Sequence, residues 1–189
     1  MKDDAPLILT LLFDPDSFER FDALRKKHFP KELNLIPAHL TLFHHLPAEE
    51  IDEIKDHLRS SAQGESAFSC RVSGLRMLGN GVAFDVDGAR LERLRNDLAS
   101  DWFDWLTAQD RQRFKPHVTI QNKVTPERAK ALYEKMDAEF EPFSFEACGL
   151  LLWRYRGGPW EAVERFEFGE ATYDGAPNSA VAAGESETE

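Results

Sequence analysis

Two short stretches of the sequence repeat one another, Ala38-His39-Leu40-Thr41-Leu42 and Pro116-His117-Val118-Thr119-Ile120. In each, a His and a Thr stand two positions apart among apolar residues, which is the period of a β-strand, so both polar side chains face the same way. If the two strands lie side by side about a local two-fold axis, two imidazoles and two hydroxyls converge on one cleft. Such a set of groups is suited to moving protons around a phosphate.

Chance does not readily account for the repeat. With six His and seven Thr in 189 residues, a random order would contain about 0.2 His-x-Thr matches, although any short motif carries a false-positive risk. The alternative is that both are core histidines beside threonines that favour strands. Two matches at equivalent points of a duplicated unit favour the functional interpretation.

The segments that follow the two motifs also match in pattern. HLTLFHHLPAEEIDEIKDHL from His39 and HVTIQNKVTPERAKALYEKM from His117 share a strand, a break and the apolar positions of a helix. Further matching pairs are Phe68-Ser69 with Phe143-Ser144 and Gly74-Leu75 with Gly149-Leu150. This internal duplication predicts an α+β fold of two lobes related by a pseudo-two-fold axis, each an antiparallel sheet flanked by helices, with a central cleft that carries both His-x-Thr motifs.

The hydrophobic periodicity predicts the individual elements. Strands are expected at Leu7–Phe13, at the two motifs, in a hairpin over Phe68–Asp87 that turns at Gly79-Asn80-Gly81, and in a final pair over about Phe143–Phe168. Helices are expected after the Asp14–Ser17 turn, from near Pro47, through Leu91–Leu98 and from Thr125-Pro126. We place Phe18, Phe21 and Leu24 on the inner face of the first helix, and we expect Ser60–Ser66 to be a connector.

Bulk properties limit the class of protein. A net charge of −11 argues against a protein that coats nucleic acid non-specifically, because that affinity comes from many Lys and Arg contacts to phosphates. Residues 170–189 contribute five carboxylates and no Lys or Arg, which leaves −6 on the rest of the chain. A local basic pocket is compatible with that balance.

Composition also predicts the domain organisation. We expect one two-lobed domain over residues 1–169 and a disordered acidic tail over residues 170–189, because the tail offers no apolar face to bury. Two cysteines, Cys70 and Cys148, are too few for a disulfide framework and lack the spacing of a zinc site. No run approaches the ~18–20 apolar residues that a membrane span needs. We therefore expect a cytoplasmic monomer without membrane contact.

The paired motifs, the Pro before the second motif and the duplicated order of elements resemble the 2H phosphoesterase superfamily. The resemblance covers residues 5–169 and is strongest to bacterial proteins named 2′-5′ RNA ligases or RNA 2′,3′-cyclic phosphodiesterases. It implies that His39 and His117 are the catalytic acid and base and that Thr41 and Thr119 hold phosphate oxygens. It also implies hydrolysis of a 2′,3′-cyclic phosphate, or ATP-independent joining of such an end to a 5′-hydroxyl, without metal or nucleotide cofactor.

Several alternatives stay open at this point. The expected partners are RNA 2′,3′-cyclic phosphate ends or small cyclic nucleotides. A phosphodiesterase for another small cyclic or 2′-5′-linked nucleotide would use the same groups, and so would a protein that binds RNA ends without turnover. Turnover separates the enzymes from the binding protein, and a panel of substrates separates the two enzymes.

Other residues near the motifs are weaker candidates. Phe43, Lys115 and Lys123 extend the two strands and are candidate substrate contacts, by stacking on a base or by adding positive charge. The run His44-His45 departs from the apolar or aromatic residues that commonly follow the first motif in relatives. With a carboxylate, it could instead bind a metal. The rings and guanidinium groups of Trp153–Trp160 could contact a nucleotide or pack across neighbouring strands.

Overall fold

The computed structural model describes residues 4–169, so the tail predicted over residues 170–189 lies outside the described residues. The strands are β1 Leu7–Phe13, β2 Thr41–Leu46, β3 Phe68–Met77, β4 Val82–Asp87, β5 His117–Gln121, β6 Phe143–Arg154 and β7 Glu161–Glu167. The helices are α1 Pro15–His28, α2 Ile51–Gly64, α3 Ala89–Asp101 and α4 Pro126–Asp137, with short 3-10 turns at Lys31–Leu33, Ala48–Glu50 and Phe103–Trp105. None of these helices is long and apolar enough to cross a membrane.

The strands form one antiparallel sheet that contains the internal symmetry. Its order is β2-β1-β6-β3-β4-β5. Strand β7 lies off this path and pairs with residues 149–154 of β6, beyond the residues 143–147 that pair with β3. The duplication equates β1 with β4, β2 with β5 and β3 with β6, and under this exchange the six-strand order reads the same from either end. The axis lies between β3 and β6, where Phe68 pairs with Ala147 and its counterpart Phe143 pairs with Val72. The predicted α+β fold with its pseudo-two-fold axis is confirmed, and the two lobes share one continuous sheet.

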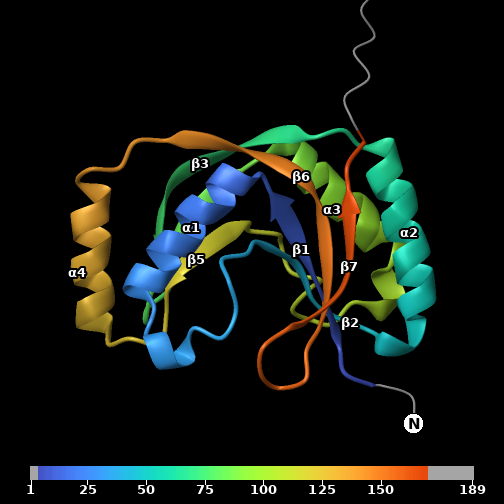
Figure 1. Ribbon diagram of the computed structural model, residues 1–189, viewed down its shortest axis with the longest axis horizontal. Helices are drawn as coiled ribbons and strands as arrows, with labels where there is room; N and C mark the ends of the chain where they lie inside the picture. Colours follow the sequence, from blue (N-terminus) through green and yellow to red (C-terminus); the bar gives the residue numbers. More distant parts are fainter. Residues whose placement is uncertain (1–3, 170–189) are drawn as a thin grey trace, which may run out of the picture.

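In each half of the duplication, the helix that follows the first strand packs on strands of the other half; these helices are α1 and α3. Helix α1 follows β1 and packs against β5, beside α4, which packs against β3 and β4. Helix α2 packs against β6 and β7. Trp102, which ends α3, lies 5.3 Å from Phe43 of β2. Figure 1 shows the resulting arrangement, with α1 and α4 on one side and α2 and α3 on the other. The two halves therefore interlock rather than form separable domains.

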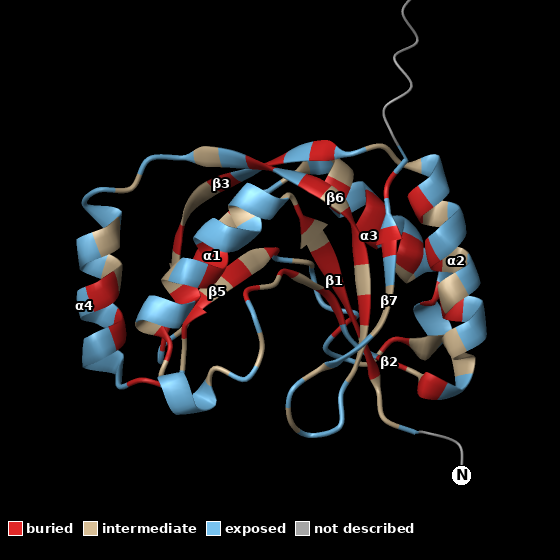
Figure 2. Ribbon diagram, in the orientation of Figure 1, coloured by how far each residue is buried: buried red, intermediate tan, exposed pale blue. Residues whose placement is uncertain are grey.

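The core runs along the sheet between these helix pairs. Leu7, Leu9 and Leu11 of β1 are almost fully buried, and Phe21 of α1 packs edge to face on Phe145 with ring centroids 5.6 Å apart. Figure 2 shows buried residues along the strands and exposed residues on the outer faces of α2 and α4. Burying one such apolar side chain contributes about 1.5–3 kcal/mol, so this sheet holds the motif strands in place.

Two local predictions are wrong. Phe18 is 37% exposed, because the inner face of α1 consists of Phe21, Asp22 and Arg25. Two of those residues are charged and are buried through hydrogen bonds to distant segments, which a purely apolar pattern does not reveal. The expected connector Ser60–Ser66 is mostly helical, since α2 continues to Gly64. Ser and Gln are tolerated near a helix end when the buried positions, here Leu58 and Ala62, keep their spacing.

Candidate active site

The two motif histidines are held in the same way. Nδ1 of His39 lies 2.8 Å from the carbonyl oxygen of Pro37, and Nδ1 of His117 lies 2.9 Å from that of Lys115. A carbonyl oxygen only accepts hydrogen bonds, so each Nδ1 carries a proton and donates it. Nε2 is then the ring nitrogen that remains for chemistry in both residues. The two halves present two imidazoles of matched tautomer.

Helix α1 connects the two motifs through buried polar side chains. Asp22 accepts a hydrogen bond of 2.9 Å from the main-chain N–H of Ala38, directly before His39. Arg25, only 3% exposed, donates to the carbonyl oxygen of Thr119 at 2.8 Å. The same guanidinium donates through Nε to Asn34 at 2.8 Å. One helix therefore sets the position of the loop before the first motif and of the strand of the second.

A β-bulge in each motif strand changes which side chains face the cleft. Thr41 of β2 pairs with Thr10 of β1. The adjacent residue of β1, Leu9, pairs with Phe43, which is two residues after Thr41 in β2. In β5 the same shift places Thr119 opposite Ala83 and Gln121 opposite Val82. Each motif strand thus has one extra residue after its Thr, and beyond that point the alternation of inward and outward side chains shifts by one.

The bulge overturns one predicted substrate contact. Phe43 is fully buried, with its ring against Trp102 and the guanidinium of Arg95 4.3 Å from its centroid. It is therefore a core residue and not available to a ligand. His44, the next residue along the strand, is exposed in its place. A strict two-residue period from His39 and Thr41 predicts instead that Phe43 faces the cleft and that His44 points away from it.

A buried carboxylate holds His44. Asp110, in the segment between α3 and β5, is 2% exposed. Its Oδ1 lies 3.1 Å from Nδ1 of His44 and accepts the main-chain N–H of His44 at 2.9 Å, while Oδ2 accepts that of His45 at 3.0 Å. Burial by itself would raise the pKa of Asp110, but these bonds outweigh burial and the pKa lies below its ordinary value. Asp110 is therefore an anion that fixes both the edge of β2 and the ring of His44.

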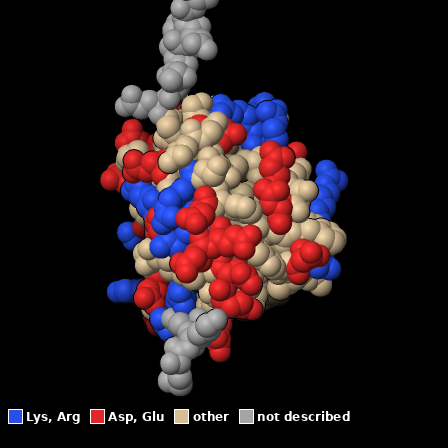
Figure 3. Space-filling view, turned by 90° about the vertical axis from the view of Figure 1, so that its right-hand side faces the viewer, with Lys and Arg blue, Asp and Glu red and all other residues tan. Residues whose placement is uncertain are grey.

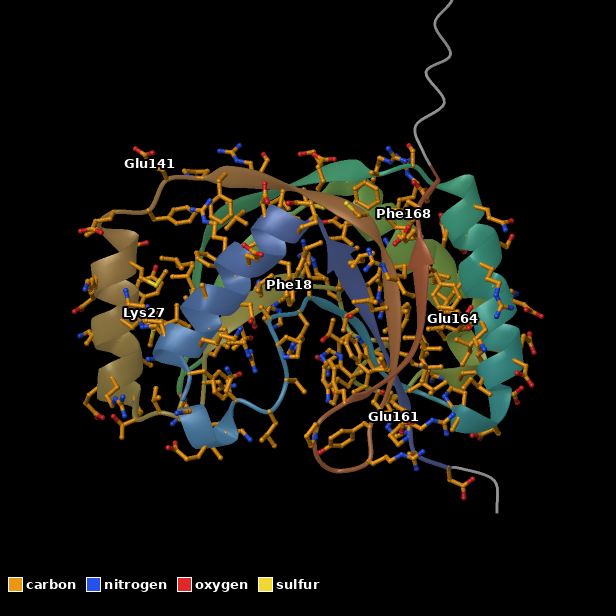
Figure 4. The ribbon with its side chains drawn as sticks, in the orientation of Figure 1. Phe18, Lys27, Glu141, Glu161, Glu164 and Phe168 are labelled. Carbon is orange, nitrogen blue, oxygen red and sulfur yellow. The ribbon has the colours of Figure 1, made fainter. Side chains whose placement is uncertain are left out.

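Three cavities surround the motif residues. The His117 cavity, of about 380 Å³, is lined among others by Thr41, His44, Arg76, Arg113, Lys115 and His117. The Trp160 cavity, of about 450 Å³, is lined among others by Arg25, His44, Lys123, Tyr155, Gly157 and Trp160. The His39 cavity, of about 340 Å³, is lined among others by Thr10, Phe18, Pro37, His39, Leu151 and Trp153. Phe18 of α1 is labelled in Figure 4.

The cavities place the predicted site residues relative to one another. His44 lines both the His117 cavity and the Trp160 cavity, and the ring of Trp160 lies 4.7 Å from that of His39. Lys115 shares a cavity with His117, whereas Lys123 lies beyond His44 in the Trp160 cavity. Thr119 is half-buried in β5, with its carbonyl bound by Arg25.

Both motif histidines favour the neutral form in the free protein. Burial lowers the pKa of His39 to about 4, and the nearby charges of Arg25, His117 and His44 act in the same direction, against the bond to Pro37. Burial is also the main cause that lowers the pKa of His117, with Asp85 acting in the opposite direction. Each imidazole can therefore accept a proton at neutral pH. An anionic phosphate between them would favour protonation of one ring.

Sequence reasoning missed two contributors to the site, Arg25 and Asp110. Arg25 had a local signal, a charged residue at an inner position of an amphipathic helix. Asp110 had none, since its role depends on a contact with a strand that precedes it by more than sixty residues. Trp160 was weighed as a nucleotide contact or as cross-strand packing, and its ring lies against both His39 and Trp153. Within residues 4–169, no three His, Cys, Asp or Glu side chains are grouped as metal ligands, and His44 pairs with Asp110 instead.

Comparisons with known proteins give a consistent result. A sequence model of the 2′-5′ RNA ligase superfamily matches residues 13–159. TT0787 of Thermus thermophilus is similar with a TM-score of 0.63 and 17% identity, covering 88% of this chain and 99% of that one. E. coli LigT complexed with 3′-AMP is similar with a TM-score of 0.59 and 19% identity, again over 88% and 99% of the two chains. A further structure, described as a phosphoesterase, gives a TM-score of 0.57 at 18% identity over the same shares. No curated protein matches the sequence.

Proposed function

The chain belongs to the 2′-5′ RNA ligase superfamily, and we propose that it is a phosphoesterase that hydrolyses the 2′,3′-cyclic phosphate ends of RNA or of small nucleotides. The matched pair of imidazoles carries this proposal. His39 and His117 have the same tautomer and the same main-chain partner two residues upstream, so each keeps Nε2 for an acid or base role, and the two rings are near enough for His117 to act on the pKa of His39. We expect the protein to act as a cytoplasmic monomer.

The chemistry follows from that pair. Nε2 of one histidine takes a proton from water as its oxygen bonds to phosphorus, and the other histidine donates a proton to the ribose oxygen whose bond to phosphorus breaks. The hydroxyls of Thr41 and Thr119 donate to the non-bridging oxygens. With the 5′-hydroxyl of a second RNA in place of water, the same steps release the 3′-oxygen and leave a 2′-5′ linkage. The two histidines exchange roles in the reverse direction.

The surface charge favours recognition of a chain end over recognition of a long RNA. Helix α2 carries the exposed carboxylates Asp52, Glu53 and Asp56, and Figure 3 shows that Asp and Glu gather broadly on the face that it forms. Glu164 of β7, labelled in Figure 4, binds Lys55 at 2.8 Å and Arg59 at 2.9 Å, so the cations of that face are already paired with carboxylates. The 3′-AMP in the LigT complex also supports a small nucleotide as ligand. We therefore assign binding to the phosphate and the groups next to it.

Product analysis with 2′,3′-cyclic mononucleotides and a short cyclic-phosphate oligonucleotide tests the proposal. His39→Ala and His117→Ala should each lower kcat by roughly 10²–10⁴-fold, the range for loss of a general acid or base, while far-UV circular dichroism stays unchanged. His45→Ala, an exposed residue on the same strand as Thr41, is the matched control and should retain activity. Tight binding of cyclic ends by the wild type without turnover would show an RNA-end-binding protein, and near-normal activity in either motif variant would refute the assignment.

A further inference from the structure

The His117 cavity concentrates positive charge on an acidic protein. Four of its lining residues are cationic, Arg76, Arg95, Arg113 and Lys115, and Asp110 is the only carboxylate among the described residues that line it. The chain as a whole has a net charge of −11. Such a local excess attracts anions, and its position beside His117 and Thr41 connects it with the proposed chemistry.

Neighbouring groups neutralise only part of this charge. Arg76 forms an ion pair with Asp85. Arg95 is 5% exposed, its guanidinium lies over the ring of Phe43, and it donates to the main-chain oxygen of Asp110, but its Nε has no hydrogen-bond partner among the described residues. Arg113 and Lys115 are exposed and form no ion pair within residues 4–169, although they also line a further cavity together with Asp85, Asp87 and Glu92. The cavity thus has a positive surplus for a ligand to neutralise.

His44 stands in the same cavity with its orientation fixed. Nδ1 of His44 is hydrogen-bonded to the carboxylate of Asp110, which also accepts the main-chain N–H groups of His44 and His45. Because Nδ1 is occupied, Nε2 is the nitrogen that a ligand can reach, and the His44 side chain is 45% exposed. An anionic ligand oxygen at Nε2 would place the ring between two acceptors, the ligand and the carboxylate of Asp110, which is the arrangement in which an imidazole donates from both nitrogens. His44 is also close enough to His39 and to His117 to act on the pKa of each ring.

We propose that this part of the His117 cavity binds a second phosphate group of the substrate, with His44 as a hydrogen-bond donor and Asp110 as the residue that positions it. Arg113 and Lys115 supply the remaining charge. The inference rests on the proposed function and narrows its substrate class to 2′,3′-cyclic phosphate ends that carry another phosphate, as a phosphodiester or a 5′-phosphate.

The neighbouring cavity argues against a base in this position. Tyr155 and Trp160 line the Trp160 cavity on the other side of His44, with the aliphatic Leu33 and Leu35. Its cations are the exposed Lys123 and the buried Arg25, whose guanidinium is bound by Asn34 and by the carbonyl oxygen of Thr119. Rings and apolar side chains suit a nucleobase, whereas guanidinium and ammonium groups suit a phosphate. His44 lies between the two, so a nucleotide can place its ring system and its second phosphate on opposite sides of this residue.

The test compares two substrates that differ by one group, a nucleoside 2′,3′-cyclic phosphate with a free 5′-hydroxyl and the same compound with a 5′-phosphate. The wild type should prefer the 5′-phosphorylated compound by about 10–100-fold in kcat/KM, the range for one hydrogen bond to a charged group, chiefly through KM. His44→Gln removes the ring and should lower the ratio of the two kcat/KM values severalfold, while Arg113 and Lys115 keep part of the preference. His45→Gln, which alters the adjacent exposed residue, should keep the wild-type ratio. A change in general reactivity cancels in this ratio.

The outcomes separate this inference from the proposed function. Equal kcat/KM values of the wild type for the two compounds, or an unchanged preference in His44→Gln, would overturn the role of His44 while the phosphoesterase assignment stands. Failure of the wild type to turn over either compound would instead refute the proposed function. Calorimetric titration with the corresponding nucleoside bisphosphate and monophosphate measures the same preference without turnover, and equal affinities there would also overturn the inference.

Discussion

Replacing Asp110 by Ala tests whether one carboxylate fixes both the edge of the sheet and the cleft. The two oxygens of Asp110 accept the main-chain N–H groups of His44 at 2.9 Å and His45 at 3.0 Å. β2 is the end strand of the sheet, so no further strand replaces these bonds. A hydrogen bond to a charged group contributes about 1.5–3 kcal/mol, and Arg95, 5% exposed, would also lose the negative charge of Asp110 that acts on it. We therefore expect the free energy of unfolding to fall by roughly 3–5 kcal/mol.

Urea denaturation followed by far-UV circular dichroism measures this change. His44→Gln removes only the ring contact and keeps both main-chain bonds, so its free energy of unfolding should fall by less than about 1 kcal/mol. Asp97→Ala, at an exposed position of α3, is the matched control and should stay within about 0.5 kcal/mol of the wild type. A loss below about 1 kcal/mol in Asp110→Ala would refute the reasoning, because it would mean that water replaces the carboxylate without cost.

Two further predictions concern the pH dependence of the reaction and the symmetry of the sheet. The proposed mechanism needs one protonated and one neutral imidazole, and the pKa of His39 is about 4 while that of His117 is below its ordinary 6.5. We therefore expect kcat/KM to fall about tenfold per pH unit above 6.5 and to fall again below about 4. A plateau that extends to about pH 8 in a pH–rate profile would contradict the ionisation states described above. Gly149→Ala should strongly destabilise the protein, because the new Cβ would lie 2.2 Å from the carbonyl oxygen of Phe166 in β7. Gly74→Ala, at the equivalent place in β3, meets no atom within 4 Å and should be tolerated. Equal melting temperatures of the two variants would show that β7 does not restrict β6 in this way.

Much of the architecture could be predicted because its signals are local. The apolar run in Leu7–Phe13, the Thr125-Pro126 start of a helix and the Gly79-Asn80-Gly81 turn each depend on a few neighbouring residues, and β1, α4 and the β3–β4 hairpin confirm them. The repeated motifs extended this reasoning to the whole chain. A duplicated unit predicts a two-fold relation between its copies, and the palindromic strand order has that relation.

The candidate site was only partly accessible from the sequence. The two-residue side-chain period of a strand by itself brings His39 and Thr41 to one face of the first motif, and His117 and Thr119 to the equivalent face of the second motif. The same rule places Phe43 in the cleft, and there it fails. A bulge is a property of the pairing between β2 and β1, so its position cannot be read from either strand alone.

The amino-acid sequence by itself therefore determined the order of strands and helices, the internal duplication and the four polar residues of the motifs, because these are expressed in spacings of a few residues. Only the tertiary structure decided that His44 faces the cleft, that Asp110 holds it, and that α1 of the first half binds the motif strand of the second through Arg25. The physical reason is that burying a charged group requires partners for its hydrogen bonds. For Asp110 and Arg25 those partners lie 66 and 94 residues away along the chain.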